Sequence, residues 1–163
     1  MSNYKADLHK IKAFAFDVDG VFTDGSVLTY VNGDLLLIYN AKDGYAVRYA
    51  VDKCYPIAII TGGASETIKM RLSQCNVTDI YLCSHYKLPD FEDFCYKYDL
   101  RPEEVLFMGD DIPDIPIMEK CGIPTCPSDA IIEVNRSAAF ISPYQGGHGC
   151  VRDIIEQVLK VHG

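Results

Sequence analysis

The stretch KAFAFDVDG, residues 12–20, joins a short apolar run to two aspartates and a glycine. The run at residues 12–16 has the length and composition of a buried strand, and it stops at Asp17. Three later apolar runs also end in residues with polar chemistry, so the pattern recurs along the chain. These later runs lead into Thr61-Gly-Gly63, into Ser84 and Lys87, and into Gly109-Asp-Asp111.

Apolar runs of strand length alternate with segments of helical period through most of the chain. This alternation predicts an α/β fold, a three-layer Rossmann-like domain with a mainly parallel sheet. The predicted strands are at residues 12–16, 57–60, 79–83, 105–108 and 138–141, and the predicted helices are at 44–53, 65–75, 89–98, 114–120 and 151–161. With 163 residues and no linker rich in Pro, Gly or Ser, the chain is expected to form a single domain, residues 1–163, without a large cap domain.

One segment departs from this alternation. Residues 27–40 have the pattern of two strands around Asn32-Gly33, a common hairpin turn. Residues 35–39 are very apolar for an exposed arm, and an isolated hairpin is only marginally stable in water. We therefore expect a β-hairpin flap at about residues 24–41 that packs against another surface, such as a second subunit.

Charge and composition exclude several classes of protein. The net charge of −8 argues against non-specific binding to nucleic acid. No apolar run approaches the length of about 20 residues that a membrane helix needs, and residues 1–10 lack the apolar stretch of a secretory signal. The seven cysteines are scattered without a CxxC pair, which favours reduced thiols over a zinc site. These features predict a cytoplasmic protein with no nucleic-acid or membrane partner.

The polar residues that follow the predicted strands are expected to meet in space. Ligands of open α/β sheets bind at the carboxyl ends of the strands. The residues that this rule brings together are Asp17, Asp19, Thr61, Lys87, Asp110, Asp111 and Asp114.

Asp17 and Asp19 suit the two chemical tasks of a phosphatase. An ionised Asp17 could attack phosphorus without a general base. Asp19, if protonated, could donate to the leaving oxygen and then take a proton from the attacking water. Gly20 would allow the sharp turn after them. Taken alone, the DxDG tetrad is also compatible with two solvated or capping aspartates beyond a strand.

The GDDIPD sequence at residues 109–114 gathers carboxylates at another strand end. Oxygen ligands of this kind suit Mg²⁺, which would screen the nucleophile from the phosphate. Taken alone, this cluster could instead cap the following helix. Its combination with Asp17 and Asp19 favours a metal site.

Two further elements suit the binding of a phosphate group. Thr61 and Gly62 offer a hydroxyl and free backbone N–H groups where we expect a helix to begin. Lys87 would supply a fixed positive charge. An ordinary turn and a surface lysine are the alternative interpretations of these residues.

The order of the four elements, DxDG, Thr, Lys and GDDxxD, resembles that of the haloacid dehalogenase superfamily. The resemblance implies a phosphatase with Asp17 as the nucleophile and Asp19 as the acid and base. It further implies that Thr61 and Lys87 bind phosphate. Mg²⁺ would be held by Asp17, the backbone carbonyl of Asp19 and Asp110, with Asp111 and Asp114 in support.

A narrower resemblance is carried by residues 16–25, the hairpin, residues 39–44 and the GGHG loop at residues 146–149. These segments look like those of the 3-deoxy-D-manno-octulosonate 8-phosphate phosphatases. That family consists of small, lidless homotetramers whose hairpins pack between subunits. The resemblance implies hydrolysis of this phosphorylated sugar acid, through a phosphoaspartate, in lipopolysaccharide precursor synthesis.

Two departures from the family pattern leave the substrate open. Gly63 and its neighbours stand where relatives often carry Arg or Glu, and His148 stands in a loop that often contains Arg. His148 is our candidate substrate contact, and His85 is a weaker one. The alternatives are a nonulosonate 9-phosphate of the sialic acid type as substrate, a non-enzymatic oligomeric module of a sugar-nucleotide enzyme, and a phospho-receiver domain.

Overall fold

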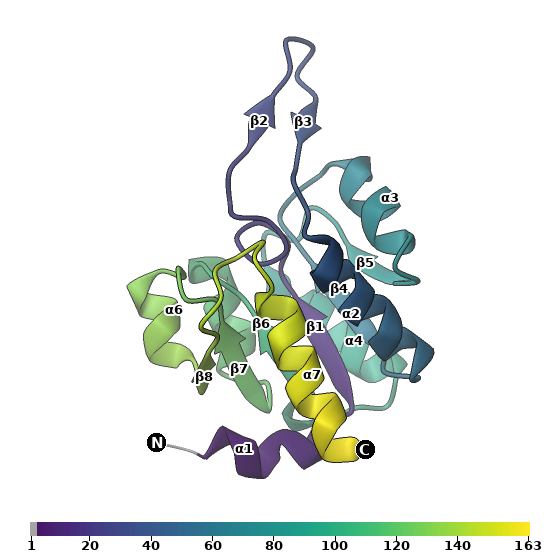
Figure 1. Ribbon diagram of the computed structural model, residues 1–163, viewed down its shortest axis with the longest axis vertical. Helices are drawn as coiled ribbons and strands as arrows, with labels where there is room; N and C mark the ends of the chain where they lie inside the picture. Colours follow the sequence, from purple (N-terminus) through teal and green to yellow (C-terminus); the bar gives the residue numbers. More distant parts are fainter. Residues whose placement is uncertain (1–2) are drawn as a thin grey trace.

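A computed structural model describes residues 3–163, so residues 1–2 of the expected domain lie outside the described part. A six-stranded sheet runs through the centre, and helices cover both of its faces (Figure 1). Its strands are β1 (Ala13–Phe16), β4 (Ile57–Ile60), β5 (Asp79–Tyr81), β6 (Val105–Met108), β7 (Ile123–Cys126) and β8 (Phe140–Ile141). The spatial order is β5-β4-β1-β6-β7-β8, and all neighbouring pairs are parallel. This confirms the predicted α/β class.

The central strand β1 shows how the sequence produces three layers. Its side chains alternate between the two faces of the sheet, because successive residues of a strand point in opposite directions. Phe14 and Phe16 belong to one buried apolar cluster, and Ala13 and Ala15 to the other. Each face is therefore covered by its own set of helices.

The first cluster lies beneath α2 (Ala41–Asp52), α3 (Glu66–Ser73) and α7 (Cys150–His162). The second lies beneath α4 (Lys87–Lys97), α5 (Ile115–Met118) and α6 (Ile132–Ser137). Short helices α1 (Tyr4–Asp7), η1 (Leu8–Lys10), η2 (Pro102–Glu104) and η3 (Ile112–Asp114) complete the chain. Figure 1 shows α2 and α7 side by side, which their many contacts confirm. Within residues 3–163, no helix is long and apolar enough to cross a bilayer.

The sequence prediction missed β7 and α6. A proline inside a short run argues against an internal strand, because proline has no backbone N–H to donate. In β7, however, the carbonyl of Pro124 accepts from Ala139 N, and β8 pairs with β7 only from Thr125 onwards. The missing N–H therefore lies before the residues of β7 that pair with β8. The strand predicted at 138–141 is also shorter, and β8 contains only its last two residues.

A second correction concerns the start of α3. The helix predicted at residues 65–75 begins at Glu66, so the Thr61-Gly-Gly63 segment, which we expected to open it, ends before the helix starts. Ser65 caps it by accepting a hydrogen bond from Thr67 N, which fixes the start of a helix. The Thr-Gly-Gly segment is therefore a loop between β4 and the helix.

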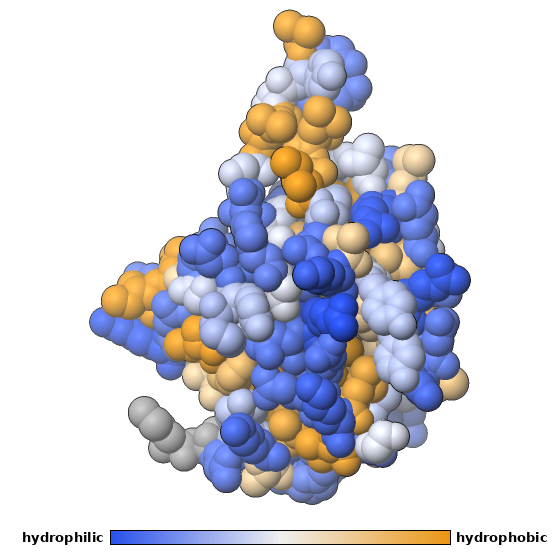
Figure 2. All heavy atoms as spheres, viewed as in Figure 1, coloured by the Kyte–Doolittle hydropathy of each residue, from blue (hydrophilic) through white to orange (hydrophobic). Residues whose placement is uncertain are grey.

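The predicted hairpin is present as β2 (Leu28–Thr29) and β3 (Leu35–Leu36), which pair antiparallel. Its turn contains Gly33 at φ +86°, a backbone conformation that glycine adopts without strain. The hairpin projects from the body, beyond the edge of the sheet at which the strands end (Figure 1). Apolar residues gather on this projection (Figure 2). The paired strands are shorter than the sequence pattern suggested.

Candidate active site

The ends of β1 and β6 form the centre of the site. These strands are neighbours at the point where the order of the sheet reverses, which is where ligands of such sheets bind. The backbone N–H of Asp17 donates to the carbonyl of Met108 at 3.0 Å, so the two strand ends are held together. Asp17 and Asp110 therefore lie on one edge of the sheet, as predicted.

Gly20 allows the loop after β1 to meet Asp110. Its φ is +80°, and a Cβ at this position would lie 1.9 Å from Asp110 Oδ2. Any other residue would collide with that carboxylate. The glycine of the DxDG tetrad thus has a double role, because it both turns the chain and makes room for a functional side chain.

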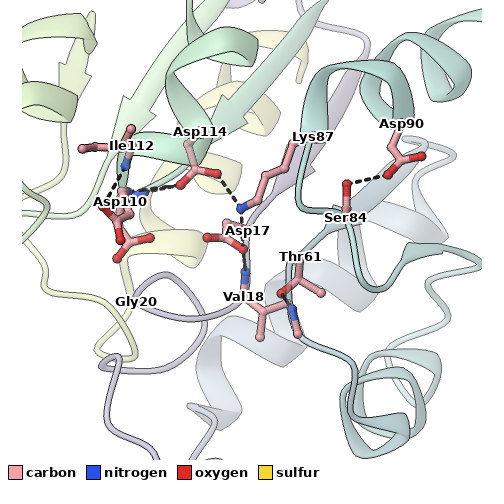
Figure 3. A network of polar contacts seen from close by, with 12 residues as sticks. Asp17, Val18, Gly20, Thr61, Ser84, Lys87, Asp90, Asp110, Ile112 and Asp114 are labelled. Atoms are coloured by element: carbon pink, nitrogen blue, oxygen red, sulfur yellow. Dashed lines mark hydrogen bonds and ion pairs between the residues drawn. The ribbon is translucent and has the colours of Figure 1, made fainter.

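Lys87, the first residue of α4, joins two carboxylates. Its Nζ is 2.9 Å from Asp17 Oδ1 and 2.7 Å from Asp114 Oδ1, and all three side chains are buried (Figure 3). A charge-assisted contact of this kind is shorter and stronger than one between neutral groups. Lys87 therefore holds the predicted nucleophile in a fixed position.

Asp114 supports the loop that carries Asp110. Its Oδ2 accepts from the backbone N–H groups of Asp110 at 2.9 Å and Asp111 at 3.2 Å. Gly109 lets this carboxylate approach, since a Cβ there would lie 2.4 Å from Asp114 Cγ. The exposed Asp111 instead accepts from Ile112 N and caps η3. Each aspartate of GDDIPD thus has a distinct role in the loop.

The charges of the cluster shift one another. Burial raises the pKa of Asp17 well above its usual value; the charge of Asp114 adds to this effect, and Lys87 opposes it. Burial, Asp114 and Asp111 together raise the pKa of Asp110 to about 7. Burial alone would lower the pKa of Lys87, but Asp17 and Asp114 outweigh it and raise that pKa. Without a further positive charge, the cluster therefore favours retaining protons.

The cluster fits a divalent cation. Carboxylate oxygens of Asp17, Asp110 and Asp114 lie within 4.8 Å of one another. Among residues 3–163, Asp110 Oδ1 is buried and has no hydrogen-bond partner. A set of oxygen donors with an unsatisfied acceptor suits Mg²⁺, which prefers carboxylate ligands. Both oxygens of Asp114 are already in contact, Oδ1 with Lys87 and Oδ2 with the backbone N–H groups of Asp110 and Asp111, whereas Lys87 and Val18 N both contact Oδ1 of Asp17. Asp17 and Asp110 are therefore the better placed ligands.

A cavity with a volume of about 330 Å³ lies beside this cluster, and it is lined by Asp17, Asp110 and the half-buried Asp19. Burial raises the pKa of Asp19, and the charge of Lys87 counteracts part of this effect. A carboxyl group with a raised pKa keeps its proton closer to neutral pH, which suits a general acid. Asp17 and Asp19 thus differ in exposure, since Asp17 is buried and Asp19 half-buried, and the pKa of both carboxyl groups is raised.

Most of the predicted site residues line this cavity. They are Asp17, Asp19, Gly62, Lys87, Asp110 and Asp111. Thr61 is fully buried next to it, and its Oγ1 accepts from Gly63 N at 3.1 Å. His85 also lines the cavity, although the sequence made it only a weak candidate. Its position on the loop between β5 and α4, just before Lys87, was the available signal.

His148 does not line the cavity. The residue is exposed, and its Nδ1 is 2.8 Å from the carbonyl oxygen of Gly146. The loop that carries it is nevertheless attached to the site, because Gly147 N donates to Val21 O at 2.9 Å. The structure thus places the GGHG loop beside the DxDG loop without bringing the His148 ring into the cavity of this chain.

Asp43 is a supporting residue that the sequence reasoning missed. This buried carboxylate accepts from the backbone N–H groups of Gly149 at 3.3 Å and Arg152 at 2.9 Å. A carboxylate at a helix start satisfies free N–H groups and complements the helix dipole. Asp43 therefore holds the GGHG loop at the first turn of α7. The signal was its place in the segment at residues 39–44, which was noted only for its resemblance.

Known proteins that are similar to this chain in sequence and fold include phosphatases. No family model matches the chain. The 3-deoxy-D-manno-octulosonate 8-phosphate phosphatase KdsC of Escherichia coli K12 is 34% identical over 158 residues, which are 97% of this chain and 84% of the relative. The crystal structure of the phosphatase of that name from Yersinia pestis matches with a TM-score of 0.95 and 28% identity, over 98% of this chain and 86% of that one.

A third match has ligands. The phosphatase of the same name from Moraxella catarrhalis, in complex with magnesium ion, phosphate ion and KDO molecule, has a TM-score of 0.94 at 25% identity. The match covers 98% of this chain and 92% of that one. Sequence identity over nearly the whole length and the agreement of the folds lead to one conclusion. The chain belongs to the 3-deoxy-D-manno-octulosonate 8-phosphate phosphatase family of the haloacid dehalogenase superfamily.

Proposed function

We propose that this protein is a Mg²⁺-dependent phosphatase that hydrolyses 3-deoxy-D-manno-octulosonate 8-phosphate in lipopolysaccharide precursor synthesis. The proposal depends above all on one observation. Lys87 Nζ lies within 3 Å of both Asp17 and Asp114, at the edge of the sheet where a buried oxygen of Asp110 has no hydrogen-bond partner among residues 3–163. This arrangement positions a nucleophile, a cation and a metal ligand around one small cavity.

Asp17 acts as the nucleophile. One of its carboxylate oxygens forms a bond to phosphorus as the bond between phosphorus and the sugar oxygen breaks, which yields a phosphoaspartate. Lys87 and the hydrogen bond from Val18 N to Asp17 Oδ1, 2.7 Å long, orient the carboxylate. The orientation matters because a well-placed reacting pair avoids much of the entropic cost of reaction.

Asp19 acts as the general acid and then as the general base. Its proton passes to the leaving sugar oxygen in the first step. In the second step, the carboxylate accepts a proton from the water that attacks phosphorus. This attack breaks the bond between phosphorus and Asp17, releases inorganic phosphate and restores both aspartates.

The metal is bound by Asp17, the backbone carbonyl of Asp19 and Asp110, while Asp111 and Asp114 support the loop. When bound, Mg²⁺ supplies positive charge that favours the ionised form of its ligands and offsets the charge of the phosphoryl group. Thr61, Gly62 and Lys87 bind the phosphate oxygens, with the Thr61 hydroxyl and the loop N–H groups as donors. His148 is proposed to contact the substrate of a neighbouring chain or after a loop movement.

The chain forms one domain, residues 1–163, and acts in the cytoplasm without nucleic-acid or membrane partners. Its hairpin flap, residues 24–41, joins copies of the chain into a homotetramer. The support for this is the apolar surface of the flap. Leu28 and Leu36 lie opposite each other in the hairpin and are 55% and 47% exposed. Association between copies would bury this apolar surface.

A panel of phosphorylated sugars tests the activity. Release of inorganic phosphate is measured with Mg²⁺ from the octulosonate 8-phosphate, a nonulosonate 9-phosphate and mannose 6-phosphate. We expect the octulosonate ester to give the highest kcat/KM, and EDTA to abolish turnover. Equal, slow hydrolysis of all three esters would exclude this substrate assignment, and a preference for the nonulosonate would replace it.

A further inference from the structure

We propose that His85 binds the carboxylate of the sugar-acid substrate and thereby selects sugar acids over neutral sugar phosphates. This inference rests on the proposed function. It assigns a specificity role to a residue that lines the cavity but has no part in the reaction steps above.

The cavity needs a second cationic or donor group. Its lining includes the carboxylates of four aspartates, and among the described residues its side chains with N–H donors are those of Lys87 and His85. Lys87 is already bound to Asp17 and Asp114. A phosphorylated sugar acid brings two anionic groups, and burying a charged group without a partner is costly. The carboxylate therefore requires a donor other than Lys87.

The imidazole of His85 is available for this contact. Hydrogen bonds of histidine rings in the described part of the chain involve His148 and His162, so the His85 ring nitrogens have no partner there. The residue is exposed, and it faces the loop after β4. A Cβ placed on Gly62 would lie 3.8 Å from His85 Nδ1, so the ring stands directly over this glycine.

Two adjacent glycines form the part of the cavity lining next to His85. Gly62 and Gly63 both line it, and a Cβ on Gly63 would lie 2.8 Å from Ile68 Cδ1 and 3.7 Å from Asp19 Oδ2. A side chain at Gly63 would have to displace the end of Ile68. Gly62 therefore lies next to His85 and Gly63 next to Asp19, the residue that we assign to the leaving sugar oxygen, so both side chains border the same Gly-Gly segment of the cavity lining.

The backbone around His85 is held firmly. Ser84 N donates to Thr61 O at 2.9 Å, and Ser84 Oγ donates to Asp90. Two residues after His85, Lys87 is fixed by its contacts with Asp17 and Asp114. His85 therefore lies between two anchored residues, and a site on a fixed loop positions a ligand with little loss of entropy.

The test compares selectivity rather than activity alone. For the wild type and for His85→Ala and His85→Gln, kcat/KM is measured on octulosonate 8-phosphate and on mannose 6-phosphate, which has no carboxylate. A hydrogen bond to a charged group predicts a fall of about 10- to 100-fold in the ratio of the two values for His85→Ala. The Gln variant, which keeps a donor, should recover part of the ratio.

Tyr86→Ala is the matched control. Tyr86 is the next residue in the same loop and 88% exposed, and it does not line the cavity, so the selectivity ratio should stay unchanged. Thermal unfolding of each variant at a fixed concentration checks that the loop replacement leaves the fold intact. An equal loss on both substrates, or an unchanged ratio in His85→Ala, would overturn the assignment.

A binding measurement separates this inference from the proposed activity. Calorimetry with the free sugar acid, which lacks phosphate, reports on the carboxylate contact without any turnover. Weaker binding to His85→Ala than to the wild type supports the inference even if the wild type hydrolyses none of the phosphate esters. Equal binding to both proteins refutes it, even if the wild type is an active phosphatase.

Discussion

The edge of the sheet that carries the site differs from the hairpin above it. Charged groups at the edge are buried and paired within one chain, whereas the hairpin exposes apolar side chains. At the edge, Asp17, Lys87 and Asp114 are buried and bound to one another. The hairpin has two paired strands of two residues each. Leu37 and Tyr39 of this flap pack against the core, but most of its large apolar side chains are exposed, namely those of Val27, Leu28, Tyr30, Val31, Leu35, Leu36 and Ile38.

This difference separates the part of the molecule that contacts within one chain complete from the part that we propose to pack against another copy. The charged cluster is specified by contacts within the chain, so its geometry does not depend on association. The hairpin gains little from its own short pairing, since a two-stranded hairpin is marginally stable in water. We therefore expect changes at the edge to affect chemistry and stability, and changes in the hairpin to affect assembly.

The largest expected effect follows from Asp17→Asn. An amide cannot attack phosphorus, so turnover should fall by about 10⁴-fold or more, as for other nucleophile deletions. The amide is neutral and nearly isosteric, and it removes a charge that faces Asp114. Unfolding and the mass in solution should therefore be close to those of the wild type. Phosphate release, thermal unfolding and light scattering measure the three properties, and a variant with a tenth of wild-type activity would exclude Asp17 as the nucleophile.

Lys87→Met should have the largest effect on stability. It leaves two buried carboxylates without their cation, and breaking a buried pair in this way costs about 3–5 kcal/mol. The loss should be smaller at pH 5 than at pH 7.5, because protonation of Asp17 and Asp110 relieves the repulsion. Chemical denaturation in EDTA measures the free energy of unfolding at both values.

Lys120→Met provides the matched control for this change. The ammonium of Lys120 pairs with Glu92 at 3.0 Å, and both side chains are about half exposed. An exposed pair of this kind contributes about 0–1 kcal/mol, so the control should be nearly as stable as the wild type. If both lysine variants lose the same amount, the buried contacts of Lys87 do not hold the edge together.

The sequence allowed the core of the site to be predicted because its signals are local. Asp17, Asp110 and Asp114 follow short apolar runs, and the rule for parallel sheets brings such strand ends together. Lys87 could be placed in the same way, at the end of the third run. Its exact partners could not be predicted, because they depend on how α4 packs against the sheet.

The misses have different physical causes. β7 contains Pro124, whose lack of an N–H is tolerated only because of where β8 begins to pair. The role of Asp43 depends on contacts with Gly149 and Arg152, more than a hundred residues away in sequence. No periodicity or short motif contains such information. The fold class was therefore predictable, whereas the long-range hydrogen bonds that hold the GGHG loop were not.

The hairpin is tested by introducing a pair of opposite charges that keeps its strand pairing. Leu28→Glu combined with Leu36→Lys places opposite charges on residues that are direct cross-strand partners. Such a pair supports the hairpin by about 0.2–1 kcal/mol while it removes apolar surface. We expect a smaller species in light scattering, with the free energy of unfolding of the body nearly unchanged.

Ile132→Glu is the control for the loss of apolar surface. Ile132 lies in α6 and is 59% exposed, which is close to the value for Leu28. This variant should retain the mass of the wild type. If the double hairpin variant also keeps that mass, the flap is not the surface through which copies of this chain associate.

The last prediction concerns the pH dependence of stability in the absence of metal. Burial raises the pKa of Asp110 from 3.8 to about 7, so the folded protein holds a proton that the unfolded chain releases. Stability in EDTA should therefore fall as the pH rises from about 4 to about 7. Glu104 acts in the opposite direction, because Lys12 lowers its pKa to about 2, but its contribution is lost only below this range.

Magnesium should reverse the trend, because its ligands must be deprotonated and the ion then competes with protons. The increase in melting temperature caused by Mg²⁺ should be larger at pH 8 than at pH 5, and Asp110→Asn should remove most of that difference. Asp99→Asn is a suitable control, since this exposed residue has φ +52°, a conformation that asparagine also tolerates. An Mg²⁺ effect that is equal at both pH values, or that survives in Asp110→Asn, would place the ion elsewhere. In that case the unpartnered oxygen of Asp110 would be a strained acceptor rather than a ligand, and the contrast between a self-sufficient edge and a dependent hairpin would lose its main support.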